Sequence, residues 1–154
     1  MKPSANTLEF TFERLIPAPP HEVYDAWLDP KIPGNPWNAA EKFILDPKVD
    51  GLFYWVLRGT SHYGRFTEIE RPRRMQHTWV SPNTLGHESI VTLTFKRQGE
   101  DTLMTFVHSG LPDHEGASGH ENGWNYFVGV FCEQFGDGSR KQYRWEEAHP
   151  PVKE

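Results

Sequence analysis

The stretch HENGWNYFVGVFCEQF, residues 120–135, decides how this chain must fold. Its large apolar side chains recur at offsets of three or four, which is the spacing of one face of an α-helix. That face carries His120, Trp124, Phe127, Val128, Phe131 and Phe135. The segment reads as helical back to His114, and Gly136 and Gly138 follow it, so the sequence predicts a helix over 114–135.

The beginning of this helix and its internal glycines set further expectations. Ser118 and Glu121 have the spacing of a capping box, so regular helix is expected from Ser118, with Gly116 in a looser turn. Gly123 and Gly129 each cost up to about 1 kcal/mol relative to alanine in a helix interior. We therefore expect both glycines to allow a close approach between the helix and a sheet.

Segments of strand type precede the helix. Residues 8–16 alternate Leu and Phe with Glu and Thr, the period-two pattern of a half-buried strand. Pro19 and Pro20 then open a short amphipathic helix over 21–29, and Trp37 follows in a loop. Further strands are expected at 42–46, 52–58, 61–70, 74–80, 87–97 and 102–109. Because the turns between them are short, these strands are expected to be antiparallel.

The composition limits the classes of protein to which the chain can belong. A chain of 154 residues fits one domain. The net charge of -5 argues against binding to nucleic acid or to an anionic membrane, since both depend on basic excess. The sequence has no run of about 18 apolar residues and no targeting pattern at its start, so we expect a cytoplasmic protein. Phe, Trp and Tyr make up 14% of the chain, which predicts a largely aromatic interior.

The order of the elements predicts an α+β architecture. A curved antiparallel sheet of about six or seven strands, with a short helical segment after the first strand, needs one face covered. The long C-terminal helix is the element large and apolar enough to cover it. Wrapping the sheet around that helix leaves a space between them, and aromatic side chains would line it.

Five segments of the chain resemble the activator of Hsp90 ATPase homologue 1-like (AHSA1-like) family, within the START/Bet v 1-like (SRPBCC) superfamily. They are FERLIPAPPHEVYDAWLDP, GRFTEIERPRRMQHTWV, ESIVTLTF, LMTFVHSGLP and GWNYFVGVF. The resemblance covers about residues 8–135 and implies the helix-grip fold, in which the sheet surrounds the helix and a hydrophobic cavity. It also implies a single START/Bet v 1-like domain over 1–154, with a core at about 8–136 and a tail at 137–154.

The chain departs from the family pattern at two places. Many relatives carry two adjacent tryptophans after the first helix, whereas this chain has Trp37 alone. His77 stands where the corresponding strand of relatives carries an apolar residue. The wider superfamily resembles carriers of lipids and polyketides, cyclases and dehydratases, and co-chaperone domains, so the resemblance does not by itself imply a reaction.

Strand and helix parity supplies the candidate binding residues. The side chains expected to face a ligand are Trp55, His77, Trp79, Phe106, His108, Trp124, Phe127 and Phe131. Four histidines share the parity of the apolar concave positions: His62, His77, His87 and His108. Neutral imidazoles can transfer protons, hydrogen-bond a ligand or bind a metal. No HxH, HExxH or CxxC spacing occurs, so we expect no metal and no cofactor.

We expect a non-enzymatic domain that binds a hydrophobic or aromatic small molecule between the sheet and the C-terminal helix. Two alternatives stay open. The first is an enzyme of cyclase, dehydratase or hydrolase type that uses His77 as a general base in the cavity. The second, which the family name implies, is an Hsp90-type chaperone-interacting module with an exposed apolar patch. An edge strand also leaves a homodimer open.

Overall fold

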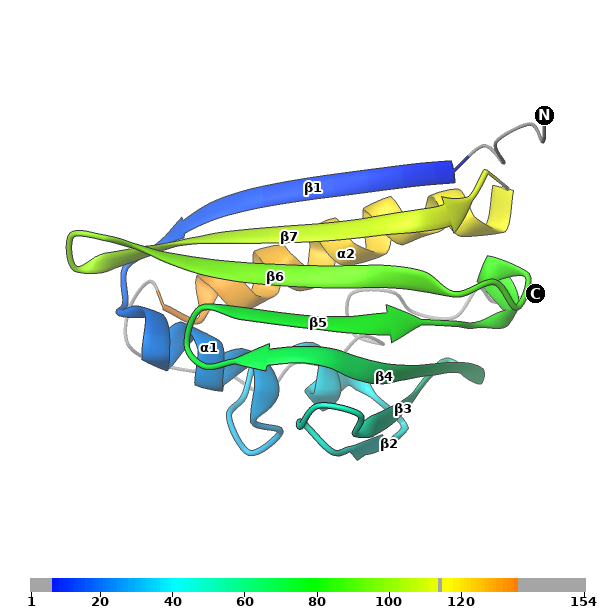
Figure 1. Ribbon diagram of the computed structural model, residues 1–154, viewed down its shortest axis with the longest axis horizontal. Coiled ribbons are helices and arrows are strands. Elements are labelled where there is room, and N and C mark those ends of the chain that lie inside the picture. The colour runs from blue at the N-terminus through cyan, green and yellow to red at the C-terminus, as the bar shows by residue number, and fades with distance from the viewer. Residues whose placement is uncertain (1–6, 114, 136–154) are drawn as a thin grey trace, which may run out of the picture.

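Seven strands in one antiparallel sheet form the frame of the molecule (Figure 1). The computed structural model describes residues 7–113 and 115–135. Its elements are β1 (Thr7–Ile16), α1 (Pro20–Leu28), η1 (Pro36–Ala39), β2 (Lys42–Leu45), β3 (Leu52–Leu57), β4 (Thr60–Glu70), β5 (Arg74–Trp79), η2 (Pro82–Thr84), β6 (Ser89–Gln98), β7 (Asp101–Pro112) and α2 (Glu115–Glu133). The predicted tail, 137–154, lies outside the described residues.

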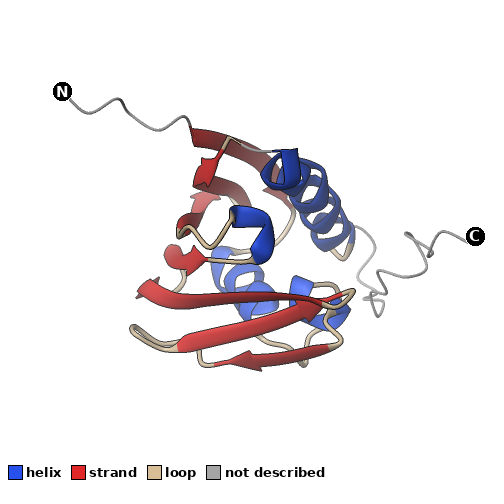
Figure 2. Ribbon diagram, turned by 90° about the vertical axis from the view of Figure 1, so that its right-hand side faces the viewer, coloured by secondary structure: helices blue, strands red, loops and turns tan. Residues whose placement is uncertain are grey.

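The strand order is β1-β7-β6-β5-β4-β3-β2, so β1 from the start of the chain lies beside β7 from its end. Every neighbouring pair is antiparallel. Figures 1 and 2 show the sheet curving about α2, which runs along one face, while α1 covers the sheet near one end. This arrangement confirms the predicted α+β helix-grip fold.

Alternation along the strands places the core on the face that α2 covers. In β5, Met75, His77 and Trp79 are buried, while the residues between them are partly exposed. In β7, Phe106 and His108 are likewise buried on the same face. The period-two pattern therefore identified the concave face, because a residue and its second neighbour point to the same side of a strand.

The helix α2 buries the stripe that its sequence predicts. Trp124, Phe127, Val128 and Phe131 are all buried. The Trp124 ring centroid lies 4.6 Å from that of Phe106 on β7. Full burial of one such side chain is worth about 1.5–3 kcal/mol, so this stripe is a main source of the attraction between helix and sheet.

Three details of the sequence-based prediction are wrong. Regular helix begins at Glu115, before the capping-box position Ser118. Gly123 and Gly129 do not mark a close approach to the sheet, because a Cβ at either would meet no atom of another element within 4 Å. His87 is exposed and precedes β6, so only three of the four expected histidines lie on the concave face.

A close approach of the backbone occurs within the sheet instead. A Cβ at Gly64 of β4 would overlap the ring of Phe53 and the carbonyl oxygen of Thr78. The Phe53 ring can pack this close to the β4 backbone because position 64 has no side chain. This contact helps to fill the part of the core that surrounds His77, whose ring centroid is 4.7 Å from that of Phe53.

Candidate functional site

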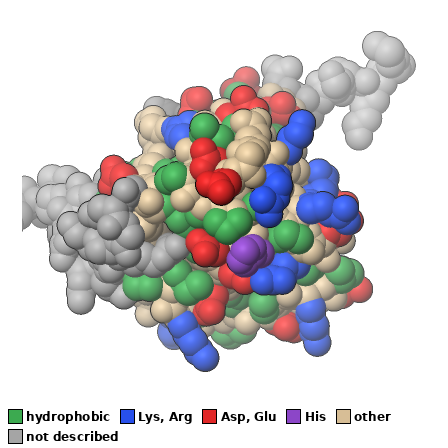
Figure 3. Space-filling view, turned by 90° about the vertical axis from the view of Figure 1, so that its left-hand side faces the viewer, with side chains coloured by type: hydrophobic (Ala, Val, Ile, Leu, Met, Phe, Trp, Pro, Cys, Tyr) green, Lys and Arg blue, Asp and Glu red, His purple; other side chains and the backbone are tan. Residues whose placement is uncertain are grey.

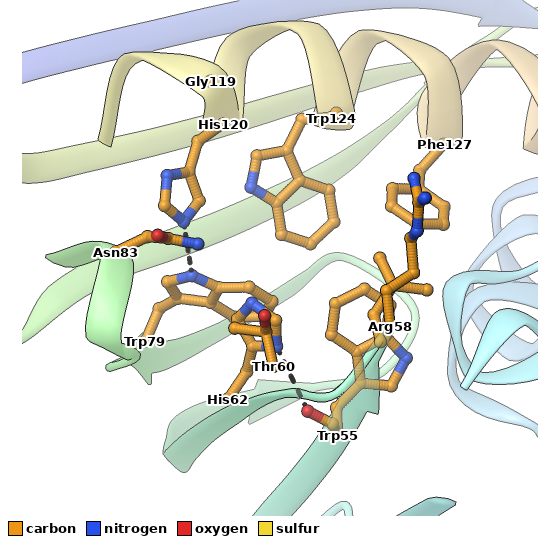
Figure 4. Close-up of a pocket in the computed structure, with 12 residues that line it drawn as sticks. Trp55, Arg58, Thr60, His62, Trp79, Asn83, Gly119, His120, Trp124 and Phe127 are labelled. Atoms are coloured by element: carbon orange, nitrogen blue, oxygen red, sulfur yellow. Dashed lines mark hydrogen bonds between the residues drawn. The ribbon is translucent and has the colours of Figure 1, made fainter. Parts of the chain in front are cut away.

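A pocket of about 290 Å³ opens between α2 and strands β3 to β5 (Figure 4). We call it the aromatic pocket. The described residues that line it are Trp55, Leu57, Arg58, Thr60, His62, Trp79, Asn83, Gly119, His120, Gly123, Trp124 and Phe127. It lies at the end of the sheet where η2 and the first turns of α2 are found. Its volume is close to the lower end of the range usual for small-molecule pockets, about 300 Å³.

Three indole rings from different elements form the walls of the aromatic pocket. The ring centroids of Trp55 on β3 and Trp79 on β5 are 5.7 Å apart, and those of Trp79 and Trp124 on α2 are 5.1 Å apart. Phe127 closes the helix side at 5.6 Å from Trp55. These edge and tilted arrangements are the favoured geometries of aromatic pairs, so the walls support one another without a ligand.

Two glycines on α2 leave part of the pocket unfilled. Gly119 and Gly123 both line it, and a Cβ built at either position would meet no atom of another element within 4 Å. Gly123, one of the two glycines for which the sequence suggested close helix packing, therefore faces open space instead. Because Gly119 and Gly123 have no side chains, they leave the space between α2 and strands β3 to β5 open.

The polar atoms of the three indoles are already hydrogen-bonded within the protein. Trp79 Nε1 donates to His120 Nε2 at 3.1 Å, and Trp124 Nε1 donates to His108 Nδ1 at 2.9 Å. Trp55 Nε1 donates to the backbone oxygen of Pro36 at 3.0 Å. The walls therefore present their apolar faces to the pocket, and their N–H groups fix the orientation of each ring.

His108 joins three elements through a fully satisfied ring. Ser89 Oγ donates to the carbonyl oxygen of Trp79 at 2.9 Å, so the serine accepts the hydrogen of His108 Nε2 at 2.8 Å. The neutral Nδ1 is then free to accept from Trp124. Burial lowers the pKa of His108 well below its usual value, with a smaller contribution from His120. His108 is thus a neutral structural link between β6, β7 and α2.

His62 is the concave-face histidine that reaches the aromatic pocket. Its Nδ1 donates to the carbonyl oxygen of Trp55 at 3.2 Å. Burial lowers the pKa of His62 to about 4, so the ring is neutral at pH 7. Its centroid is 4.8 Å from that of Trp79, which makes it part of the aromatic wall.

His77 lies deeper in the core and does not line the aromatic pocket. Its ring packs between Phe53 and Phe66, at centroid distances of 4.7 and 5.4 Å, and its Nδ1 donates to the Thr78 carbonyl oxygen at 2.8 Å. Burial lowers the pKa of His77 to about 4. The ring borders a separate enclosed space of about 10 Å³, room for about one water molecule at most.

Four of the eight predicted binding residues line the aromatic pocket: Trp55, Trp79, Trp124 and Phe127. The other four, His77, Phe106, His108 and Phe131, lie in the core outside its lining. The hypothesis of a general base at His77 requires a ligand cavity beside that ring. The structure places the ring beside the small enclosed space instead.

Sequence reasoning missed several residues that line the pocket. Arg58 lies in the β3–β4 turn and Asn83 in η2, where no periodic pattern indicates which way a side chain points. Gly119 has no side chain to carry a signal. His120 did carry one, since the helical spacing placed it on the same face as Trp124 and Phe127.

Arg58 occupies a special position at the edge of the pocket. Leu57 pairs with Thr60, so Arg58 and Gly59 are the two central residues of a tight turn, with φ angles of 51° and 78°. Positive φ at both positions is the pattern of a type I′ hairpin turn. Glu41 holds this turn, because its Oε1 accepts from the Gly59 N–H at 2.7 Å.

A second, wider hollow lies at the other end of the sheet, near the β4–β5 and β6–β7 turns. It is lined by Pro20, His21, Pro72, Arg73, Thr94, Phe95, Lys96 and Arg97. Figure 3 shows this end of the molecule as a mixed surface, where basic, acidic and apolar side chains lie close together. The hollow lacks the converging aromatic walls of the aromatic pocket, which we therefore take as the candidate site.

Within residues 7–113 and 115–135, no three His, Cys, Asp or Glu side chains are grouped so that they could hold a metal ion. Nor does that part of the chain contain a helix long and apolar enough to cross a bilayer. Burial raises the pKa of the Cys132 thiol to about 11, so it is protonated at neutral pH.

An antiparallel sheet curved around a C-terminal helix, with an aromatic pocket between them, places the chain in the helix-grip class of proteins. The family model for Activator of Hsp90 ATPase homolog 1-like proteins matches residues 17–133. The chain belongs to this family.

Individual relatives are similar at low identity. An uncharacterized protein from Schizosaccharomyces pombe is 27% identical over 135 residues, which is 87% of this chain but 39% of the relative, so the chain spans less than half of its length. The crystal structure of CalU16 from Micromonospora echinospora has 23% identity and a TM-score of 0.68, covering 84% of this chain and 77% of that one. An HSP90 activator from Plasmodium falciparum has 23% identity and a TM-score of 0.66, covering 79% and 91%.

Proposed function

We propose that the protein binds a hydrophobic or aromatic small molecule in the aromatic pocket. The observation that carries this proposal is the convergence of three buried indoles and Phe127 on one open space of about 290 Å³. A concave, largely apolar site with few polar groups is the usual form of a small-molecule pocket. The volume suits a compact molecule of two or three rings or a short acyl chain.

The shape of α2 supports the same proposal. An alanine at Gly119 or Gly123 would favour the helix by up to about 1 kcal/mol at each position, and the structure has room for both methyl groups. Their presence as glycines therefore has no packing reason among the described neighbours. An open ligand site explains both glycines, because side chains at these positions would project into the pocket.

The test is a tryptophan-quenching titration against a panel of lipids and aromatic metabolites, with native mass spectrometry to measure stoichiometry. We expect one ligand per chain and a loss of affinity of at least about tenfold in Gly123→Leu, whose side chain would fill the pocket. Gly129→Leu is the matched control, because Gly129 lies on the same helix outside the pocket lining. Absence of any binder from the panel, or equal affinity in both variants, contradicts the proposal.

A second candidate function is contact with an Hsp90-type chaperone, which the family and the Plasmodium falciparum relative suggest. The observation that favours it is an apolar patch on the outer face of β2 to β4. Ile44, Leu52 and Tyr63 are 63%, 57% and 51% exposed, and strand pairing places Ile44 and Tyr63 on the face of Tyr54. Exposed apolar patches commonly mark protein-interaction sites.

The chaperone proposal is tested by titrating a purified Hsp90-type chaperone with the protein and measuring both binding and ATP hydrolysis. Ile44→Asp and Leu52→Asp are expected to weaken binding by at least about tenfold, the range of an interface anchor. Leu15→Asp is the matched control, because Leu15 is 58% exposed on β1 at the opposite edge of the sheet. No binding by the unmodified chain contradicts this proposal and leaves the small-molecule proposal intact.

A further inference from the structure

Arg58 has a backbone conformation that its side chain does not favour. With a φ of 51°, it takes the first central position of the type I′ turn between β3 and β4. That position favours Asn, Asp or Gly, because other side chains are strained in the left-handed region. Strained residues concentrate at functional sites, so an arginine at this position indicates a function for its side chain.

The side chain of Arg58 lies at the edge of the aromatic pocket. Figure 4 shows it rising from the turn toward α2, on the side of the pocket where Phe127 lies. Among the described lining residues it is the one with a permanent charge, since His62 is neutral at pH 7 and His120 accepts the Trp79 N–H at its Nε2. The hairpin geometry therefore places a cation at the rim of a site whose walls are mainly aromatic.

No ion pair within the described part of the chain uses this guanidinium. The nearby Glu41 carboxylate accepts the Gly59 N–H instead and so holds the turn in place. Arg58 thus keeps its five N–H donors available on the side of the pocket. Guanidinium matches the geometry of carboxylate, sulfonate and phosphate groups, with which it forms charge-assisted hydrogen bonds.

We propose that the aromatic pocket selects amphiphiles with an anionic group, which Arg58 binds at the rim while the apolar body lies among the indoles. This inference rests on the proposed small-molecule function and narrows its ligand class. The indole N–H groups donate to His120, His108 and Pro36, so they add no charge recognition of their own. Arg58 is accordingly a specificity-determining residue.

The test compares two probes with the same three rings. 8-Anilino-1-naphthalenesulfonate carries a sulfonate that stays ionised across the working pH range, and N-phenyl-1-naphthylamine is its uncharged analogue. Quenching of protein tryptophan fluorescence gives a dissociation constant for each probe, because three indoles line the pocket. The arginine variants are Arg58→Gln and Arg58→Asn, the second of which also suits the turn.

Both Arg58 variants are expected to weaken the sulfonate probe about fivefold, as for an ion pair at the upper end of the exposed range, and to leave the uncharged probe unchanged. Added NaCl should weaken the sulfonate probe in the unmodified protein but not in the Arg58 variants. Arg65→Gln is the matched control, since it removes one exposed positive charge from β4 outside the pocket lining.

The outcomes separate the two proposals. If both probes bind and the Arg58 variants affect them equally or not at all, the anion selectivity is overturned and the small-molecule pocket stands. The same holds if Arg65→Gln reproduces the loss, because the effect would then follow net charge alone. If neither probe binds the unmodified protein, the pocket proposal fails and this inference fails with it.

Discussion

His62 and His77 occupy neighbouring strands of one concave face and meet different surroundings. Both rings donate Nδ1 to a backbone carbonyl oxygen, and burial lowers the pKa of each to about 4. His77 is enclosed by Phe53 and Phe66, whereas His62 borders the aromatic pocket. Strand parity thus identifies which side chains face inward, while the elements packed opposite decide whether those side chains meet other side chains or open space.

The largest expected effect is the loss of stability in acid. An unfolded chain protonates these histidines near their usual pKa of 6.5, whereas the folded pKa of each is about 4. Stability is therefore complete above about pH 6.5 and falls toward pH 4, by about 1.4 kcal/mol per pH unit for each such histidine. Urea unfolding between pH 7 and pH 5 measures this slope.

Two variants make the acid experiment a test of the comparison. His77→Leu should remove its share of the slope, because its enclosed ring cannot be hydrated when charged. His62→Leu should remove an equal share between pH 6.5 and pH 5, because the folded pKa of His62 is also about 4. An unchanged slope in either variant would contradict the buried, neutral state of that histidine.

Truncation of the same residues is the next largest effect. His77→Ala leaves a void that Phe53 and Phe66 cannot close without moving, so we expect a loss of about 3 kcal/mol in the free energy of unfolding. His62→Ala enlarges a pocket that is already open and should cost about 1 kcal/mol. Chemical denaturation at pH 7 measures both. A larger loss for His62→Ala would contradict the description of His77 as enclosed and of His62 as bordering open space.

A smaller effect of opposite sign is expected on the helix side of the pocket. Gly123→Ala and Gly129→Ala should each stabilise the fold by up to about 1 kcal/mol, since both sites are in helix α2 and have room for a methyl group. Only Gly123→Ala should weaken binding of the pocket probes. Destabilisation by either substitution would mean that the helix approaches the sheet there after all.

The smallest effect concerns the turn at the pocket rim. Arg58→Gly removes the strain of a side chain at positive φ and should stabilise the fold by about 0.5–1 kcal/mol. The thermal midpoint should rise while affinity for the sulfonate probe falls. A drop in the thermal midpoint would indicate that the Arg58 side chain has a packing role that outweighs the strain.

Most of the fold could be predicted from the sequence, because it depends on periodicity. Alternation gave the strands from β3 to β7, and the spacing of Trp124, Phe127 and Phe131 gave α2 and its buried face. The start of α2 was wrong because capping-box spacing at Ser118 does not exclude an earlier turn of helix.

The candidate site was predicted only in part. Phe106 and Trp79 share the parity of the concave face, yet only Trp79 lines the pocket, and the Trp124 ring packs against Phe106 at a centroid distance of 4.6 Å. The open space of the pocket depends on Gly119 and Gly123, which have no side chain whose spacing could predict it. Arg58 was missed because a turn has no period from which the direction of a side chain follows.

The two indole–imidazole hydrogen bonds run in opposite directions between the sheet and α2. Trp79 on β5 donates to His120 on the helix, and Trp124 on the helix donates to His108 on β7. His120 and Trp124 are four residues apart, so a slip of α2 by one turn, about 5.4 Å, would unpair both donors at once. The two hydrogen bonds together therefore fix the register of the helix along the sheet, as a turn fixes the register of a β-hairpin.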